Sequence, residues 1–355
     1  MDIETKLDLI KSEPLEEVIT DEELRNVLET NSRPKHYIGL EISGMLHIGH
    51  LLMGGKKIND FNKAGIETQV LLADWHTMAN NKLGGDWEKI KKVSEFYRKV
   101  FNTFCPNTKV VLGSDLYKGN DEYWKLMIQI ARRATVARAT RMLVIEGRSE
   151  KDALHISQYI YPIMQTADIW ALDADLPHAG MDQRKVHVFA KETFKEMKMK
   201  TIVPLHHYLV PSLLEPPKIT DEMSKEEQVA ANKMSKSRPG SFISILATED
   251  EVKAAMKNAW CPVGIIEGNP VMFLCKHMIL PTMGKLMVER KKEYGGDTEY
   301  TGYVELARDF EAKKLHPMDL KNAAARALID IMAPIRKRFS AEREEILKML
   351  EAPQK

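Results

Sequence analysis

Cysteine is scarce in this sequence of 355 residues. Only Cys105, Cys261 and Cys275 occur, and they lie far apart in the chain. None belongs to a CxxC pair or lies near a matching histidine cluster, which argues against a structural zinc site and against a disulfide framework. We therefore expect no metal bound by protein side chains alone.

Long apolar runs are also missing. No run approaches the roughly 20 residues that are needed to span a bilayer. The N-terminal stretch MDIETKLDLIKSEPLEEV mixes charged and apolar residues and lacks the continuous apolar region of a secretion signal. These absences predict a cytoplasmic protein without a membrane partner.

An excess of charge of one sign is absent as well. Lys plus Arg number 52 and Asp plus Glu number 51, which gives a net charge of +1. Overall charge therefore predicts no polyanionic partner, and any nucleic-acid binding must depend on local patches. The sequence shows no internal repeat and no low-complexity linker, and its length is typical of two domains.

The periodicity of apolar residues predicts alternating helices and strands. We expect helices over 1–30 (with a cap at Thr20 or Asp21), 48–64, 86–104 and 121–145, and strands over 36–43, 68–75, 109–114 and 201–210. This alternation predicts an α/β protein with a Rossmann-like, doubly wound parallel sheet. The strand signal fades after residue 248, and 319–350 is rich in helix formers, with a break or kink expected at Pro334. We place the domains at 1–248 and 249–355, the second being smaller and α-helical.

The segment GLEISGMLHIGH, residues 39–50, has the pattern of a strand, a glycine turn and a helix start. Sheets of this class bind nucleotides at such turns. His47 and His50 are three residues apart and would share a helix face, and Gly49 leaves room for a ligand near the backbone. Imidazoles and helix N–H groups can receive phosphate oxygens. Alone, the pattern equally fits two histidines satisfied by packing or capping.

The tripeptide Met-Ser-Lys occurs twice. The first copy, Met223–Lys225, includes Ser224 in Ser-x-x-Glu spacing, which predicts a helix start. The second copy is flanked by Lys233 and Lys236 and precedes Pro239-Gly240. Such a cationic loop suits the gripping of a polyphosphate, although a solvated surface turn fits the same stretch.

HIGH near the start of the chain, with KMSKS about 185 residues later, resembles the paired signature of class I aminoacyl-tRNA synthetases. The resemblance implies attack of an amino-acid carboxylate on the α-phosphate of ATP, which arrives with Mg²⁺, and then transfer of the aminoacyl group to tRNA. Catalysis would fall to His47, His50, Lys233 and Lys236. The implied ATP contacts are Gly39, Glu41, His47, Gly49, His50, Lys233, Met234, Ser235 and Lys236.

The segment YIYPIMQTADIW places Tyr161, Gln165 and Asp168 at i, i+4 and i+7 of a helix that Pro162 could begin. Polar groups among apolar neighbours suggest the wall of a pocket. The alternative is an amphipathic helix whose polar face is in water.

Together with AGMDQRKVH at 179–187 and Tyr37, this segment resembles the tyrosyl-tRNA synthetases of the archaeal and eukaryotic type, over nearly the whole chain. The resemblance implies that Tyr37 and Asp168 bind the substrate phenol. It further implies that the amino group of the substrate is held by Tyr161, Gln165 and Gln183. The pocket for the substrate ring would be lined by Leu71 and His76. Phenylalanine would leave the phenol partners unpaired, and tyrosyl-tRNA synthetases are the known example of rejection by this effect. No insertion is large enough for an editing domain.

The same resemblance implies contacts to tRNA and a symmetric homodimer with the helices around 120–160 near its interface. The acceptor stem would meet Arg141, Arg184 and Lys185. The 249–355 domain would bind the anticodon through His316 and Asp319, with Tyr294 as a stacking partner. Taken alone, the basic residues fit ordinary surface charges, and His-Pro-Met-Asp fits a helix cap.

Three positions depart from the family pattern. Ile42 stands where many relatives have proline, Ala179 replaces a common glycine, and Lys236 stands where these tyrosyl enzymes often have serine. The first affects how the glycine turn is held, the second narrows the backbone approach near the substrate, and the third adds a positive charge at the phosphates.

Three other functions compete with this one. Tryptophanyl-tRNA synthetases share the fold and both signatures, but an indole offers one donor and no acceptor, so Tyr37 with Asp168 suits a phenol better. A non-catalytic RNA-binding paralogue would not need intact HIGH and KMSKS motifs. A small nucleotidyltransferase would leave the second domain unexplained.

Overall fold

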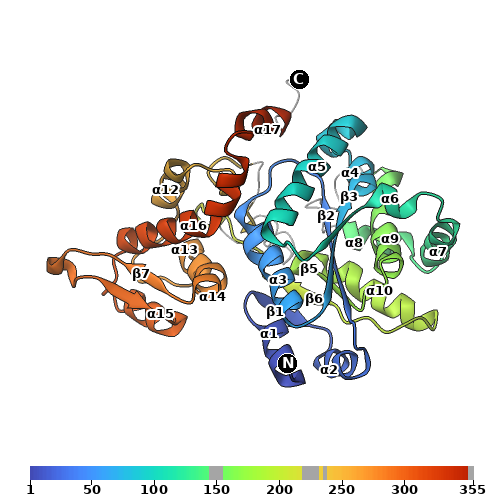
Figure 1. Ribbon diagram of the computed structural model, residues 1–355, viewed down its shortest axis with the longest axis horizontal. Helices are drawn as coiled ribbons and strands as arrows, with labels where there is room; N and C mark the ends of the chain where they lie inside the picture. The colour runs from blue at the N-terminus through green and yellow to red at the C-terminus, as the bar shows by residue number, and fades with distance from the viewer. Residues whose placement is uncertain (144–154, 218–231, 235–237, 351–355) are drawn as a thin grey trace. The chain divides into compact units, whose positions relative to one another are not determined.

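The computed structural model describes residues 1–143, 155–217, 232–234 and 238–350 (Figure 1). The chain divides into two compact units. The first comprises residues 1–44, 57–207 and the C-terminal end from Glu345, and the second comprises 45–56 and 208–344. The predicted domain boundary at residue 248 stays a prediction. The repeated Met-Ser-Lys segment at 223–225 lies outside the described residues.

The first unit holds most of the predicted α/β pattern. Its described elements, in chain order, are α1 (Ile3–Lys11), β1 (Leu15–Val18), α2 (Asp21–Thr30), β2 (Lys35–Glu41), α3 (Lys56–Lys63), β3 (Glu67–Ala73), α4 (Asp74–Ala79), the short turn η2 (Lys82–Gly85), α5 (Trp87–Phe104), β4 (Lys109–Leu112), α6 (Gly113–Tyr117), α7 (Asp121–Ala131), α8 (Val136–Leu143), α9 (Ile156–Ala171), β5 (Leu176–Gly180), the short turn η4 (Met181–Gln183), α10 (Arg184–Glu196) and β6 (Leu205–His207).

Six strands form one sheet in the order β1-β6-β5-β2-β3-β4. All neighbouring strands run parallel except β1, which runs antiparallel to β6. The chain builds outward from β2 in both directions, which is the doubly wound topology that the sequence predicts. In such sheets the loops at the carboxyl ends of the strands form the binding crevice.

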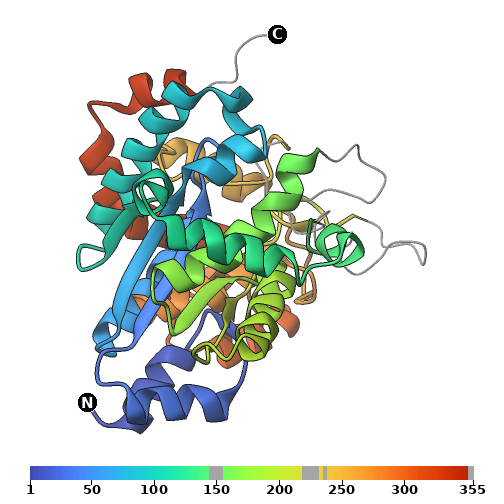
Figure 2. The same ribbon diagram turned by 90° about the vertical axis from the view of Figure 1, so that its right-hand side faces the viewer.

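Alternate residues of β2 face opposite sides of this sheet. His36 lies against Phe61 of α3, with ring centroids 4.7 Å apart. Tyr37 belongs instead to a buried cluster with Ile169 of α9 and Phe194 of α10. Figure 2 looks onto the side that carries α9 and α10, drawn in green to yellow-green. Helices therefore cover both faces, as a parallel sheet requires.

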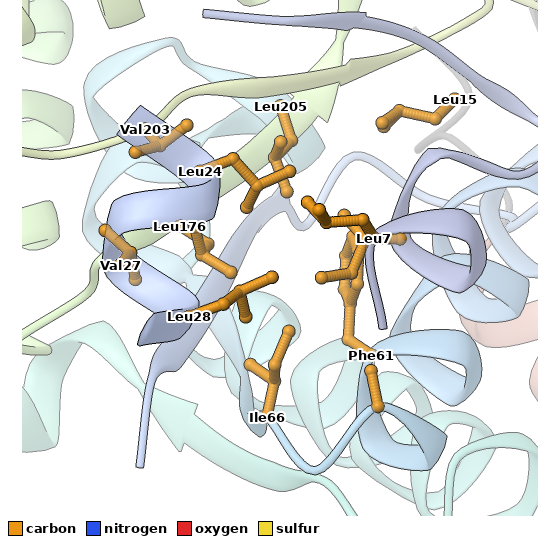
Figure 3. Close-up of a cluster of buried hydrophobic side chains, with 12 residues drawn as sticks. Leu7, Leu15, Leu24, Val27, Leu28, Phe61, Ile66, Leu176, Val203 and Leu205 are labelled. Carbon is orange, nitrogen blue, oxygen red and sulfur yellow. The ribbon is translucent and has the colours of Figure 1, made fainter. Parts of the chain in front are cut away.

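The two N-terminal helices are held to the sheet by a cluster of buried apolar side chains (Figure 3). Leu24, Val27 and Leu28 lie on one face of α2, at the i, i+3, i+4 spacing of an amphipathic helix. They meet Leu7 of α1 and Leu205 of β6 within the same cluster. Burial of each such side chain contributes roughly 1.5–3 kcal/mol.

The expectation of one helical region over 1–30 is wrong in part. Thr20 caps α2 as predicted: its side-chain oxygen accepts from the backbone N–H of Glu23, whose carboxylate accepts from the N–H of Thr20. Before it, however, Leu15–Val18 forms the edge strand β1. Four residues are too few for a periodicity that distinguishes a strand from a helix.

The long helix expected over 121–145 is two helices. α7 ends at Ala131, and α8 begins at Val136. The Thr135 side-chain oxygen accepts from the backbone N–H of Arg138 at 3.2 Å, so it satisfies one of the unpaired donors of the first turn of α8. A single threonine within a repeat of apolar residues is only a weak sequence signal for the start of a new helix.

The second unit is built around a long helix, α16 (Pro317–Phe339). Its other described elements are the single π-helical turn η1 (His50–Gly55), α12 (Glu249–Asn258), α13 (Pro270–Leu274), the π-helical turn η5 (Cys275–Ile279), α14 (Leu280–Met283), β7 (Leu286–Val288), the short turn η6 (Lys292–Tyr294), β8 (Thr298–Tyr300) and α15 (Tyr303–Glu311). The final helix, α17 (Arg343–Leu350), follows α16 (Figure 1).

The helical character predicted after residue 248 is confirmed, with two differences. β7 and β8 form a short antiparallel pair that the sequence did not reveal. α16 continues through Pro334, so no break occurs there. The proline costs one backbone hydrogen bond, but the buried side chains of Met332, Ile335 and Phe339 hold the helix on either side.

Candidate active site

Asp168 lies on α9 and is buried in the first unit, with 1% of its surface exposed. Its Oδ1 accepts hydrogen bonds from the hydroxyls of Tyr117 and Tyr123, each at 2.9 Å. Its Oδ2 lies 3.3 Å from Nε2 of His76 without hydrogen-bond geometry and has no hydrogen-bond partner among the described residues. Because buried carboxylates need partners, this oxygen is the natural acceptor for a donor on a ligand.

The buried surroundings of Asp168 shift the pKa values of this carboxyl group and of the neighbouring His76. Burial raises the pKa of Asp168 to about 7, and the hydrogen bonds from Tyr123 and Tyr117 oppose that rise. Burial lowers the pKa of His76 to about 3, so the imidazole is neutral at pH 7. A buried carboxylate beside a neutral imidazole can receive a hydroxyl without competition from a nearby cation.

Tyr37 occupies the strand β2 and is almost fully buried. Burial raises the pKa of its phenol well above the usual value, so the hydroxyl keeps its proton. Gly39 lies two residues further along, where a Cβ atom would come within 2.9 Å of the Tyr37 hydroxyl oxygen. Only glycine leaves the ring in place. Leu71 of β3 pairs with Gly39 and is fully buried.

The predicted stripe on α9 faces the interior. Asp168 and Gln165 are buried and Tyr161 is half-buried, so the interpretation as a helix with its polar face in water is wrong for the first two. Gln165 donates to the side-chain oxygen of Gln183 at 3.2 Å. The helix begins at Ile156, and Pro162 lies inside it rather than at its start.

The same helix and α4 bring Tyr161 and His76 together. Their rings meet edge to face, with centroids 4.7 Å apart. Gln165 Oε1 and both ring nitrogens of His76 are buried and have no hydrogen-bond partner among the described residues. His76 thus lies beside both Tyr161 and Asp168 of α9, and the roles of these residues and of Gln165 in tyrosine binding stay a prediction.

Sequence reasoning missed several polar partners in this unit. Tyr117 and Tyr123 were not singled out, although they hold Asp168. Asn80 is buried and donates to Glu41 at 2.7 Å, which fixes the carboxylate at the end of β2. The only sequence signal was the pair of tyrosines in DLYKGNDEYW, and their spacing does not indicate a common target.

The departure at Ile42 has a structural counterpart. Its backbone N–H donates to the Thr77 hydroxyl at 2.7 Å, a bond that proline cannot make. Two residues further on, the carbonyl of Gly44 accepts from the Tyr97 hydroxyl at 2.7 Å. The segment after β2 is therefore held by two side chains.

In the second unit, the HIGH residues form a tight turn. His47 precedes the helical turn and forms an isolated bridge with Ser244, so the two histidines do not share a regular helix as expected. Their rings nevertheless meet, with centroids 4.0 Å apart. The N–H of Gly49 donates to Nδ1 of His47 at 3.1 Å, and the N–H of His47 donates to Nδ1 of His50 at 3.1 Å.

Gly49 is required by space. A Cβ atom there would come within 2.8 Å of His47 Cε1 and 2.9 Å of Val210 Cγ2. Val210 also accepts, through its carbonyl, the backbone N–H of Met234 at 2.7 Å. Lys233 forms an isolated bridge with Pro211 beside it. The start of the KMSKS segment and the HIGH turn therefore meet at Val210. Ser235 and Lys236 lie outside the described residues.

The predicted tRNA contacts of the first unit lie on its surface. Arg141 is an exposed residue of α8, Arg184 is the exposed first residue of α10, and Lys185 is half-buried. Nε of Arg184 lies 2.9 Å from both carboxylate oxygens of Glu17. The guanidinium is thus oriented by an ion pair, and its contact to tRNA stays a prediction.

The predicted anticodon contacts occupy the second unit. Tyr294 is 66% exposed in the connection between β7 and β8. His316 is exposed and caps α16, with its Nδ1 accepting from the N–H of Met318 at 3.2 Å, and Asp319 lies half-buried in the first turn. The interpretation as a helix cap is therefore confirmed, and base recognition by these residues stays a prediction.

Two kinds of feature are absent from the described residues. No group of three or more His, Cys, Asp or Glu side chains is arranged to hold a metal ion there. No helix in that part of the chain is long and apolar enough to cross a membrane.

Comparison with known proteins finds a matching family and similar curated proteins. The family model described as tRNA synthetases class I (W and Y) matches residues 29–333. The tyrosine–tRNA ligase of Thermococcus sibiricus is 42% identical over 98% of this chain and 97% of its own length, and that of Pyrococcus furiosus is 41% identical over the same shares.

Solved structures agree with these relatives. The tyrosyl-tRNA synthetase of Pyrococcus horikoshii, crystallised with L-tyrosine, superposes with a TM-score of 0.91 at 40% identity and covers 99% of each chain. A tryptophanyl-tRNA synthetase from Aeropyrum pernix, at 16% identity and a TM-score of 0.68 over 94% of this chain and 86% of its own, shares the fold.

Proposed function

The chain belongs to the class I tRNA synthetases for tryptophan and tyrosine, and from this premise we propose how its residues act. It is a tyrosine–tRNA ligase, which activates tyrosine with ATP and transfers the tyrosyl group to tRNA. The observation that carries the substrate assignment is the buried Asp168 carboxylate, whose Oδ2 has no hydrogen-bond partner among the described residues.

The phenol of tyrosine would donate to Oδ2 of Asp168 and accept from the hydroxyl of Tyr37, which stays protonated. Such a site rejects phenylalanine, because the missing hydroxyl leaves both groups unpaired in a dry cavity. Leu71 and His76 would line the ring, and Tyr161, Gln165 and Gln183 would hold the amino group. An indole cannot satisfy an acceptor and a donor at once, which disfavours tryptophan.

Activation would proceed by attack of the tyrosine carboxylate oxygen on the α-phosphorus of ATP. The new oxygen–phosphorus bond forms as the bond to the β,γ-pyrophosphate breaks, and pyrophosphate leaves with its electron pair. ATP enters as its magnesium complex. His47, Gly49 and His50, with Lys233, Met234, Ser235 and Lys236, would stabilise the charge on the phosphoryl oxygens. Gly39 and Glu41 would contact the nucleotide, with Glu41 held by Asn80.

Residues 1–248 would form the catalytic domain and 249–355 the anticodon-binding domain. Arg141, Arg184 and Lys185 would meet the acceptor stem. The exposed Tyr294 could stack on a base, and His316 and Asp319 at the start of α16 would read bases. We place the enzyme in the cytoplasm, where tRNA is charged.

The enzyme would work as a symmetric dimer formed by the helices around 120–160. Three large apolar side chains on these helices support the dimer: Ile128 of α7, Val136 of α8 and Ile156 of α9 are 58%, 73% and 82% exposed. A partner subunit that covered them would remove apolar surface from water. Light scattering should give twice the chain mass of 40.5 kDa; a monomer at working concentration would contradict the dimer.

The direct test of the function is ATP–pyrophosphate exchange with each of the twenty amino acids. Tyrosine alone should support exchange. Exchange that depended on tryptophan, or none with any amino acid, would overturn the proposal. Transfer to tRNA is then measured with labelled tyrosine, so that activation and aminoacylation are scored separately.

A further inference from the structure

Two tyrosine hydroxyls converge on a single oxygen of Asp168. Tyr117 closes α6 and Tyr123 lies in α7, and both donate to Oδ1 at 2.9 Å. Both rings are buried, with centroids 4.6 Å apart. The two donors therefore reach the carboxylate from different elements, and neither lies in a segment whose motif pointed to the site.

The direction of these bonds is fixed by chemistry. A tyrosine hydroxyl can donate or accept, but an ionised carboxylate only accepts, so both hydroxyls donate to Oδ1 of the ionised side chain. The other oxygen is left facing His76, whose Nε2 lies 3.3 Å away. Burial makes that imidazole neutral, because it lowers the pKa of His76 to about 3.

On this geometry we propose that Tyr117 and Tyr123 are positioning residues for tyrosine selection: they hold Asp168 ionised and turned so that only Oδ2 is presented to the substrate phenol. The inference rests on the proposed role of Asp168. It adds that discrimination against phenylalanine depends on two hydroxyls that do not themselves contact the phenol.

The charges around Asp168 agree with this role. Burial raises the pKa of Asp168 to about 7, Tyr123 and Tyr117 lower it, and the carboxylate of Asp74 raises it. The remaining neighbours are His76, which is neutral, and Tyr37, whose pKa burial raises well above its usual value. Without the two hydroxyl donors, a larger share of Asp168 would be protonated at neutral pH.

A purely structural role would look different. The hydroxyl of buried Tyr97 donates to a backbone carbonyl, that of Gly44, which is a common way to satisfy a tyrosine in a core. Tyr117 and Tyr123 instead place both hydroxyls 2.9 Å from one ionisable side chain, and for Tyr123 this contact is shorter than the 3.4 Å to the backbone carbonyl of Met164. Two donors on one oxygen restrict the rotation of a carboxylate more than one donor does.

The test uses Tyr117→Phe and Tyr123→Phe, each of which removes only a hydroxyl. In pyrophosphate exchange, each variant should lose about tenfold in kcat/KM for tyrosine, mainly through KM. The low kcat/KM for phenylalanine should stay unchanged, so that discrimination falls by the same factor. The pH at which kcat/KM for tyrosine reaches half its plateau should move upward.

The matched control is Tyr300→Phe. Tyr300 is buried in the second unit and donates to Asp309 at 3.3 Å, so the change removes a partly buried tyrosine–aspartate bond between two residues that have no proposed role in amino-acid activation. Exchange kinetics should stay at the wild-type level. Circular dichroism and thermal unfolding of all three variants establish that each is folded.

Two results would overturn the inference. One is an equal fall in kcat/KM for tyrosine and phenylalanine, and the other is an unshifted pH profile together with wild-type discrimination. Either leaves the proposed function intact as long as the wild type activates tyrosine and Asp168→Ala does not. Failure of the wild type to activate tyrosine would instead remove the proposed function itself.

Discussion

The neighbourhood of Asp168 and the turn from His47 to His50 differ in where the partners of their polar side chains lie in the sequence. Asp168 is buried, and its partners Tyr117 and Tyr123 lie 51 and 45 residues away in the sequence. The turn is half-buried at His47 and His50, and its side-chain hydrogen bonds join residues two or three apart, while its backbone is bonded to the distant residues Ile243 and Ser244. On the proposed function, selectivity would depend on side chains brought together from distant parts of the sequence, and phosphate binding on imidazoles oriented by neighbouring backbone N–H groups.

The difference agrees with what each region is proposed to bind. A phenol differs from a benzyl group by one hydroxyl, and water would mask that difference unless the site were dry. The proposed phosphate site binds one nucleotide, ATP, and does not have to distinguish between amino acids. It needs only hydrogen-bond donors that are already in place for the phosphate oxygens. Each region should therefore fail in a distinct way when altered.

The largest effect is expected for Asp168→Ala. The phenol would be buried without an acceptor, and kcat/KM for tyrosine in pyrophosphate exchange should fall on the order of a thousandfold. ATP binding, measured by calorimetry, should be unchanged. Asp330→Ala, at an exposed residue of α16, serves as the control. If Asp168→Ala activated tyrosine at close to the wild-type rate, the proposed role of Asp168 in binding the phenol would be wrong.

Gly49→Ala addresses the second region. The new Cβ would come within 2.8 Å of His47 Cε1, so it would displace that ring and crowd Val210. Adenylate formation should slow by about 10 to 100-fold, as expected for a misplaced donor at the transition state, while tyrosine binding persists. Gly302→Ala, where no heavy atom lies within 4 Å, should behave as wild type. If Gly49→Ala instead lost tyrosine binding, the turn could not be separated from amino-acid recognition.

The pH dependence of tyrosine activation should also reflect the first region. Since burial raises the pKa of Asp168 to about 7, the ionised acceptor is lost as pH falls below 7. In the wild type, kcat/KM for tyrosine should drop by up to about tenfold per pH unit there and level off above it. Asp168→Asn should lack this inflection. A flat profile from about pH 5.5 to 8.5 in the wild type would mean that the carboxylate does not titrate in this range.

The smallest effect is expected outside both regions. Thr20→Ala removes the capping box of α2, which should lower the free energy of unfolding by about 1 kcal/mol in urea denaturation. Exchange kinetics at 25 °C should not change. A loss of activity without a loss of stability would show that α2 matters to the site directly.

The sequence predicted the two regions unequally. Strong apolar runs placed β2 and β3 near their observed bounds, and HIGH and KMSKS were visible as short motifs because the residues of each are contiguous in the sequence. Tyr117 and Tyr123 were invisible, since only the folded sheet brings α6 and α7 to α9. β1 and β5 were missed for a different reason: strands of four or five residues with histidine, proline or glutamate give little periodicity.

A crystal structure of the tyrosine complex would show whether the buried carboxylate recognises the phenol of tyrosine. We expect the phenol oxygen within about 3 Å of both Asp168 Oδ2 and the Tyr37 hydroxyl, with Oδ1 still bound by Tyr117 and Tyr123. A complex in which the phenol binds elsewhere, or in which the Asp168 side chain turns out into solvent, would disprove this mode of recognition.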